Sequence, residues 1–557
     1  MPTLNWIGKK AVINHDRDVP FHLLQEVPEL SFGDKDSGNL IVQGDNLIAL
    51  KSLLPYYAGR VQCIYIDPPY NTVNEELVYN DNVNDPVIRS WINQVVGKES
   101  EDLSRHDKWL CMMYPRLKLL REFLRQDGTI WVSLDYHEQP YLRMLLDEIF
   151  GSKNLISEIA CVNKPSGRSD DKFIATAHES IIVYKREGVP EFGGFQPEDK
   201  ITRRYSKTDT DGRRYREEDL RKRGTHDERT DRPNLFYPFF FNQQTSEFLV
   251  GKNEMNTPDG FTRIEPMKTK KVQGTWRWER DTAIKQIAYL HPRYMPKKRQ
   301  WSVFEWEFLD ERGLVKSTTV WGFKDVNSER GTEAFLDLGF SKNDFPNPKP
   351  VGTILRVLQL ASKPGDIVLD SFAGSGTTGH AVLKQNAADQ GHRKFIMVEM
   401  QPDIAETITS ERIRRVSKGY TTPKGKVVSG LGGGGFRYYR LGNPLFDEYG
   451  NVFGEVSFSD LAKHVFFSET GSPLPDGTEL NTPFIGAYEG RAIYLLYNGI
   501  LKDRNPRSGN VLTREVLSYL PEFDGPKVVY GTGCRLSAMT LRAAQIEFKQ
   551  IPYELKR

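Results

Sequence analysis

The chain has 557 residues, more than one hydrophobic core supports, so we expect several domains. Its 76 lysines and arginines nearly balance 74 aspartates and glutamates, so no global field selects a polyanionic partner and any nucleic-acid surface must be local. The four cysteines lie far apart without a CxxC pair, so we expect neither a metal site nor a disulfide framework. No apolar run approaches the roughly 20 residues of a membrane helix, so we expect a soluble, cytoplasmic protein without a membrane anchor.

Residues 1–38 are polar, and we interpret them as an arm that wraps a neighbouring domain or subunit. The first clear strand covers residues 39–43. An acidic turn at Asp45 follows it, and then a helix with its leucines on one side.

The next apolar strand, within residues 61–70, stops at Asp67, because Pro68 and Pro69 forbid any continuation of ladder or helix. The turn presents the Asp67 carboxylate, a Pro68 carbonyl that no neighbouring N–H need occupy, and the Tyr70 ring. These groups can accept hydrogen bonds from an exocyclic amine and stack on a planar base. An ordinary strand-end Asp-Pro turn is the alternative, and a partner motif elsewhere must decide between the two.

Strands and helices continue to alternate as far as residue 184, which predicts a parallel α/β sheet with right-handed crossovers. Ligands of such sheets bind at the carboxyl edge, where Asp45 and Asp67 both lie. We interpret His106 as a helix cap or surface group, and His178-Glu179 as the plain start of a strand. We predict a polar loop over a site at 71–104, helices at 106–128 and 139–150, and strands at 129–134, 155–162 and 180–184.

The alternation stops between about residues 187 and 340. Residues 261–300 carry 11 Lys or Arg against 3 Asp or Glu, interleaved with aromatic residues. Cations neutralise phosphates and aromatic rings stack on bases, so this mixture suits nucleic acid, although a solvated surface domain stapled by aromatic side chains is the alternative. The candidate DNA-binding residues are Arg232, Lys270, Lys271, Trp276 and Arg277.

A glycine-rich loop is the partner that the Asp-Pro-Pro turn requires. A strand ends at Asp370, the chain turns through Gly374 and Gly376 into a helix, and the following strand ends at Glu399. Glycines let the backbone approach a nucleoside, and a carboxylate at the end of the next strand can bind ribose hydroxyls. The loop matches neither GxxxxGK[ST] nor GxGxxG.

The pair DPPYNT at 67–72 and DSFAGSGTT at 370–378 resembles the DNA amino-methyltransferases that use S-adenosyl-L-methionine (AdoMet). The order is that of the circularly permuted beta class, with the catalytic motif first, a target-recognition region next and the AdoMet motif last. RPNLFYP at 232–238 and FPNPKP at 345–350 look most like the Mod subunits of Type III restriction-modification systems. The resemblance covers residues 39–440.

The resemblance implies a Rossmann-like AdoMet-methyltransferase sheet of α/β class, circularly permuted, with an inserted target-recognition domain and a small C-terminal domain. We expect an N-terminal arm at 1–38, the catalytic half of the methyltransferase domain at 39–189, target recognition at 190–340, the AdoMet-binding half at 341–430, and a hinge with an interaction domain at 431–557.

The resemblance also implies roles for single residues. Asp67 and the Pro68 carbonyl would accept the hydrogens of the target amine, and Tyr70 would stack on a base flipped out of the duplex. The implied catalytic residues are Asp67, Pro68, Pro69 and Tyr70. The implied cofactor-binding residues are Asp45 near the adenine, Glu399 at the ribose, Phe345 and Lys349 over the methionine end, and Asp370, Phe372, Gly374, Gly376 and Thr377 in the loop.

Asp-Pro-Pro-Tyr is the family's usual form for adenine, so we expect N6 methylation of adenine in duplex DNA by a bacterial or archaeal defence system. Cytosine N4, RNA or a protein amide are alternative acceptors. Alternatively the chain acts mainly as a DNA-specificity and assembly subunit. We expect double-stranded DNA, a second copy of the chain and a Res-like helicase–nuclease subunit as partners.

Overall fold

The computed structural model describes residues 3–71, 105–169, 171–197, 199–269, 272–447, 451–497, 510–551 and 553–554. The chain divides into two compact units, Met1–Gly193 with Ser317–Arg557, and Gly194–Lys316. Residues 317–340, which we placed with the target-recognition segment, therefore belong to the first unit. No helix within the described ranges is long and apolar enough to cross a membrane.

The first unit is built on one large sheet, which takes in ten strands of the described residues in the order β1-β19-β2-β16-β15-β3-β4-β6-β5-β14. The run from β19 to β4 is parallel, whereas β1 and β6 are antiparallel to their neighbours. In chain order the strands are β1 His22–Glu26, β2 Leu40–Gln43, β3 Val61–Ile66, β4 Leu124–Leu134, β5 Leu155–Cys161, β6 Glu179–Lys185, β14 Val320–Trp321, β15 Ile367–Asp370, β16 Lys394–Glu399 and β19 Arg437–Pro444.

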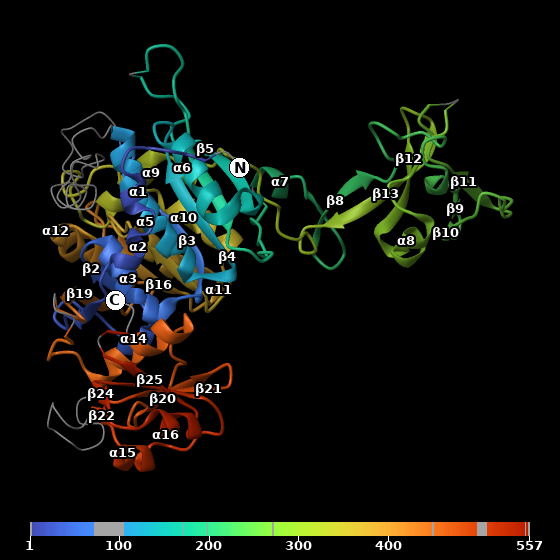
Figure 1. Ribbon diagram of the computed structural model, residues 1–557. Helices are drawn as coiled ribbons and strands as arrows, with labels where there is room; N and C mark the ends of the chain where they lie inside the picture. The colour runs from blue at the N-terminus through green and yellow to red at the C-terminus, as the bar shows by residue number, and fades with distance from the viewer. Residues whose placement is uncertain are drawn as a thin grey trace. The chain divides into compact units, whose positions relative to one another are not determined.

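The order of these strands in space differs from their order in the chain. β15 and β16 lie between β2 and β3, so a segment from later in the chain is inserted between two N-terminal strands. Figure 1 labels β2, β16 and β3 within this unit. Every residue of β3 is buried, Gln62 included, as expected for a parallel strand covered on both faces. The carboxyl ends of β2, β16, β15, β3 and β4 consequently share one edge.

Helices cover this sheet. α3 packs against α5, and α10 against α11, and they bury Leu50, Trp109 and Leu358 among other side chains. We predicted the helix after residue 106 to continue to 128, but Leu124 already pairs with Val61, so β4 starts directly where α5 ends. The larger helices are α3 Asn46–Tyr57, α5 Arg105–Phe123, α6 Gln139–Leu146, α9 Ser328–Asp337, α10 Val351–Ala361, α11 Thr377–Asp389 and α13 Ser410–Lys418.

Both ends of the described chain pack onto the same unit. The short helices α1 (Lys9–Val12) and α2 (His15–Asp18) contact α5, and β1 pairs with β19. α14 (Phe458–Thr470) packs on α3, and Leu461 and Ile493 share one apolar cluster with Leu50. The C-terminal sheet has the order β20-β21-β23-β25, with strands Phe484–Tyr488, Arg491–Leu495, Lys527–Gly531 and Ile546–Gln550.

The second unit holds two antiparallel sheets, β10-β9-β11 and β12-β13-β8-β7. Trp276 lies in their common apolar cluster, is 0% exposed, and donates its Nε1–H to the Tyr237 carbonyl at 2.7 Å. Our prediction that Trp276 contacts DNA is therefore wrong for this conformation, because its ring is core. The strands are β7 Lys207–Thr208, β8 Arg214–Asp219, β9 Phe239–Asn242, β10 Phe248–Val250, β11 Phe261–Ile264, β12 Leu290–Met295 and β13 Gln300–Phe308.

Candidate active site

Four acidic residues stand at the carboxyl ends of neighbouring parallel strands. Asp45 follows β2, Glu399 ends β16, Asp370 ends β15 and Asp67 follows β3. Residues separated by more than three hundred positions in the chain thus meet along one edge of the sheet, where open α/β sheets bind their ligands.

Lys349 joins the turn after β3 to the first residue of β6. Its Nζ lies 3.1 Å from Asp67 Oδ1 and 3.0 Å from Glu179 Oε2, and it donates to the Tyr70 hydroxyl oxygen at 2.6 Å. The Tyr70 hydroxyl in turn donates to Glu179 Oε2 at 3.0 Å. One ammonium group, two carboxylates and one phenol therefore form a closed network.

Burial and charge set the protonation of this network. Burial raises the pKa of Asp67 to about 6, with Lys349 acting to lower it and Glu179 to raise it. Burial opposes the charging of Lys349, but Asp67 and Glu179 together hold its pKa well above the usual value. Burial, followed by the two carboxylates, raises the pKa of Tyr70 well above its usual value. Near neutral pH, Asp67 is therefore largely ionised, while Tyr70 keeps its proton as a donor.

The carbonyls of the two prolines differ. Trp109, which is 0% exposed, donates its Nε1–H to the Pro69 carbonyl at 2.7 Å. No donor among residues 3–71, 105–169 and the other described ranges reaches the Pro68 carbonyl. The Asp67 side chain is 28% exposed although its Oδ1 is buried. A carbonyl that no described residue occupies thus lies beside a partly open carboxylate.

Asn71 closes the turn in a left-handed conformation, with φ of 58°. Its side-chain amide donates to the Arg105 carbonyl at 3.2 Å and to Glu138 Oε1. Glu138 Oε1 also lies 2.7 Å from His106 Nδ1. His106 therefore does more than cap a helix, because it acts through Glu138 on the end of the turn.

The glycine loop is tied to the strand ends by two carboxylates. Asp370 Oδ1 accepts the Phe372 N–H at 3.0 Å, and its Oδ2 accepts the Thr378 hydroxyl. Glu399 Oε2 accepts the Gly374 N–H at 2.7 Å. Burial raises the pKa of Asp370 to about 7.

A buried arginine supports the loop from behind. Arg412 is 0% exposed and donates to the Ser375 carbonyl at 3.2 Å, to Ser375 Oγ at 2.9 Å and to Thr377 Oγ1 at 2.8 Å. Within the described residues no carboxylate forms an ion pair with it, and burial lowers its pKa to about 9. Its hydrogen bonds are the evident compensation for its burial.

The two loops are joined through a single residue. Thr377 donates its hydroxyl to the Lys349 carbonyl at 3.2 Å, and the Nζ of the same lysine lies against Asp67. The turn after β3 and the glycine loop therefore form one site.

A family model described as DNA methylase matches residues 61–410, which include both loops. The chain belongs to the N6/N4 DNA methylase family. It is 32% identical over 392 residues to the Type II methyltransferase M.KpnI of Klebsiella pneumoniae, a match that covers 69% of this chain and 85% of that protein. It is also similar to two Type III Mod subunits, EcoPI of Escherichia phage P1 (29% identity, 84% of this chain, 74% of that protein) and EcoP15I of Escherichia coli (28%, 75%, 67%).

These findings confirm the resemblance drawn from the sequence. The chain is a DNA methyltransferase of restriction-modification type, in a family whose methyl donor is AdoMet. Both stand-alone Type II enzymes and Type III Mod subunits are among its relatives.

The methylase loop has the features that a nucleoside cofactor requires. Gly374 and Gly376 have positive φ, 49° and 75°. Within the described part of the chain, the buried Ser371 hydroxyl has no hydrogen-bond partner. Glu399 accepts the backbone N–H groups of Gly374 and Gln401, which fixes its carboxylate at the end of β16, beside the loop. The donor and acceptor set therefore fits AdoMet.

The methylase uses Asp45 structurally. Its Oδ1 accepts the N–H groups of Leu47 and Ile48 at 2.9 and 3.1 Å and so caps α3, and its Oδ2 lies 3.3 Å from the buried Arg116. A contact between Asp45 and the adenine of the cofactor stays a prediction.

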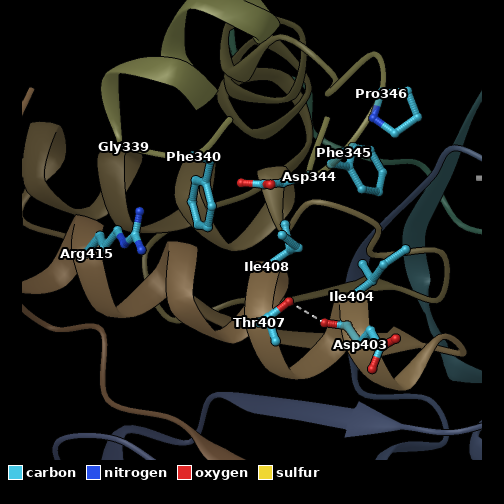
Figure 2. A pocket seen from close by; sticks show the side chains of 10 residues that line it. All are labelled: Gly339, Phe340, Asp344, Phe345, Pro346, Asp403, Ile404, Thr407, Ile408 and Arg415. Atoms are coloured by element: carbon cyan, nitrogen blue, oxygen red, sulfur yellow. Dashed lines mark hydrogen bonds between the residues drawn. The ribbon is translucent and has the colours of Figure 1, made fainter. Parts of the chain in front are cut away.

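Phe345 lies apart from these contacts and lines a cavity of about 420 Å³. Figure 2 shows its ring near Ile404 and Ile408, with Phe340 and Arg415 at the other end. Neither loop contributes to the lining. Thr409, next to Ile408, donates to the Gly374 carbonyl at 2.6 Å, so the cavity lies behind the helical segment that supports the loop.

Besides Trp276, two of the predicted DNA-binding residues, Arg232 and Arg277, lie among the described residues. Arg277 pairs with Glu305 at 2.6 Å and donates to the Asp219 carbonyl at 3.1 Å, so it is part of the sheet and its charge is neutralised. Arg232 is exposed, and its role stays a prediction. Lys270 and Lys271 lie outside the described residues.

Proposed function

We propose that this DNA methyltransferase transfers the AdoMet methyl group to the N6 amine of an adenine flipped out of duplex DNA. The observation that carries the proposal is the Asp67 carboxylate beside a Pro68 carbonyl that no described donor reaches, joined through Lys349 and Thr377 to the glycine loop. The Asp-Pro-Pro-Tyr form favours adenine over cytosine. The strand order, with β15 and β16 between β2 and β3, supports a circularly permuted Rossmann-like sheet.

The chain's own groups raise the nucleophilicity of the amine. The Asp67 carboxylate and the Pro68 carbonyl each accept one amine hydrogen, which favours a tetrahedral nitrogen with an available lone pair. The Tyr70 ring, held by Lys349 and Glu179, stacks on the base. When AdoMet is bound, its sulfonium supplies an already activated methyl group. The protein therefore contributes alignment and charge, with no covalent nucleophile.

The glycine loop provides the cofactor side of the site. Gly374 and Gly376 allow close backbone approach, and Phe372 packs at the loop. Glu399 and the Ser371 hydroxyl, which has no partner among the described residues, offer polar contacts. Asp370 holds the loop in shape from beneath.

The wider role follows the relatives. Since two of them are Type III Mod subunits, we propose that the chain modifies DNA for a defence system, as a homodimer with a Res-like helicase–nuclease subunit. The second unit would supply target recognition.

Incubation with unmethylated plasmid DNA and methyl-labelled AdoMet, followed by nucleoside mass spectrometry, tests the proposal. We expect label in N6-methyladenine. Label in N4-methylcytosine would move the acceptor to cytosine, and label absent from DNA but present in RNA or protein would overturn the proposal.

A further inference from the structure

The β12–β13 hairpin of the second unit ends in a basic turn. Met295 pairs with Gln300 at the end of the ladder, and the four residues between them are Pro296, Lys297, Lys298 and Arg299. All four are exposed. The turn has a defined conformation, because the Lys298 N–H donates to the Met295 carbonyl at 3.1 Å and the Arg299 N–H to the Pro296 carbonyl at 3.2 Å.

The three cations of this turn, Lys297, Lys298 and Arg299, have no carboxylate partner among the described residues, whereas the cations on the sheet below are neutralised. The acidic residues of the sheet face are therefore already matched, and the turn carries three positive charges that no described residue of the unit balances. The sheet pairs are Lys207–Glu217, Arg213–Asp310, Arg216–Glu307, Arg277–Glu305, Arg293–Glu217 and Arg312–Glu307.

The base of the hairpin packs into the core of the second unit, and the hairpin also carries an exposed aromatic ring. Tyr294 is 46% exposed and stands opposite Trp301, with ring centroids 5.6 Å apart. Trp301 contacts Phe241 at 5.0 Å between centroids, and Val303 is fully buried. An ordered two-stranded ribbon with cations at its tip and a ring below them matches the major groove of B-DNA, which is about 12 Å wide and admits such a ribbon.

We infer that the β12–β13 hairpin is the element of the second unit that enters duplex DNA, with Lys297, Lys298 and Arg299 on phosphates and Tyr294 against the groove. The inference deepens the proposed function and rests on it for the identity of the partner. It assigns the DNA contact to these residues in place of Trp276 and Arg277, because Trp276 bonds to the Tyr237 carbonyl and Arg277 pairs with Glu305.

The test is the salt dependence of binding by the full chain to a fluorescent duplex of arbitrary sequence, about 30 base pairs long, between about 50 and 200 mM salt. The variant carries Lys297→Gln, Lys298→Gln and Arg299→Gln. Each phosphate contact contributes about 0.9 to the slope of log K against log salt, so losing three flattens it by about 2.7. Tyr294→Ala should weaken binding with an unchanged slope, because the ring neutralises no phosphate.

A second triple variant removes the same charge from the same unit. Arg204, Lys252 and Lys285 are exposed and form no ion pair with a described residue, and changing all three to Gln should flatten the slope by less than about 0.9. An unchanged slope in the hairpin variant, or an equal change in the control, overturns the inference.

Methyl transfer separates this inference from the proposed function. The hairpin variant should keep the wild-type kcat at saturating plasmid DNA and show a raised KM for DNA. Loss of kcat with unchanged DNA affinity overturns the inference. A wild-type chain that binds duplex DNA with the full salt slope but methylates none overturns the proposed function and leaves the hairpin assignment standing.

Discussion

Lys349 Nζ lies 3.1 Å from Asp67 Oδ1, although 282 positions separate the two residues in the chain. The same lysine contacts Glu179 and Tyr70 through its side chain and Thr377 through its carbonyl. We had expected Lys349 to close over the methionine end of AdoMet. Its ammonium group lies beside the turn after β3 and its backbone carbonyl beside the glycine loop, and its place over the methionine end stays a prediction.

Replacing Asp67 tests the acceptor site directly. Asp67→Asn removes the charge and one acceptor of amine hydrogens, so we expect kcat for DNA methylation to fall by about 10² or more. DNA binding and AdoMet binding should stay near wild type. Asp476→Asn, which alters an exposed carboxylate of the same unit, should leave kcat unchanged. An Asp67→Asn enzyme with wild-type kcat would contradict the role assigned to Asp67.

Glu179 and Lys349 should shift the pH dependence in opposite directions. The pKa of Asp67 is raised to about 6 by burial, Lys349 lowers it and Glu179 raises it, and activity needs the ionised form. Glu179→Gln should therefore move the acidic limb of kcat/KM to lower pH, and Lys349→Met should move it to higher pH. Both shifts can be checked by measuring kcat/KM of the wild type and the two variants between about pH 5 and 9.

The other groups around Asp67 stay constant in this comparison. Tyr65 and Tyr70 keep their protons, because burial raises both pKa values well above the usual range, and Asp370 is present in every variant. If both substitutions lower the rate while the limb stays in place, the two residues only maintain the fold of the turn.

The sequence predicts the two loops because their signals are local. Pro68 and Pro69 stop β3 wherever the strand lies, and Gly374 and Gly376 mark a backbone turn with positive φ. The ends of the strands at Asp370 and Glu399 follow from short apolar runs.

Residues recruited by tertiary packing leave no such signal. Glu179 lies in β6 and Arg412 in α13, each outside the sequence motif whose loop it contacts. No sequence pattern predicts that the fold brings these two side chains to the site. We predicted Trp276 to contact DNA, but it is buried. The composition of a segment does not show which of its side chains face the core. The sequence likewise does not show that Arg277 forms an ion pair, whereas the cations at 297–299 have no described partner.

Gly376 should be required for cofactor affinity. Its φ is +75°, and a Cβ added there would lie 3.1 Å from the Thr409 carbonyl oxygen. Gly376→Ala places a side chain in a left-handed conformation that costs about 1–2 kcal/mol, so we expect AdoMet affinity, measured by calorimetry, to fall about tenfold. Gly425→Ala imposes a similar φ of +80° where a Cβ would meet nothing within 4 Å, and it should bind AdoMet like the wild type. Equal affinities for all three proteins would contradict a role for the turn in cofactor binding.

Arg412 offers a separation of cofactor binding from stability. It is buried without an ion-pair partner in the described chain, and it holds Ser375 and Thr377 by three hydrogen bonds. Replacing a buried ion pair by apolar side chains of similar volume is often neutral for stability, and removing Arg412 leaves no described charge partner behind. Arg412→Met should therefore keep a Tm near wild type without AdoMet, but loosen the loop and weaken AdoMet binding about tenfold.

Arg393 is also buried but pairs with Asp389 at 2.9 Å, so Arg393→Met should lower Tm and leave AdoMet affinity nearly unchanged. Thermal scans with and without AdoMet measure both effects. A loss of Tm in Arg412→Met as large as that in Arg393→Met, with unchanged AdoMet affinity, would assign Arg412 to the core rather than to the loop.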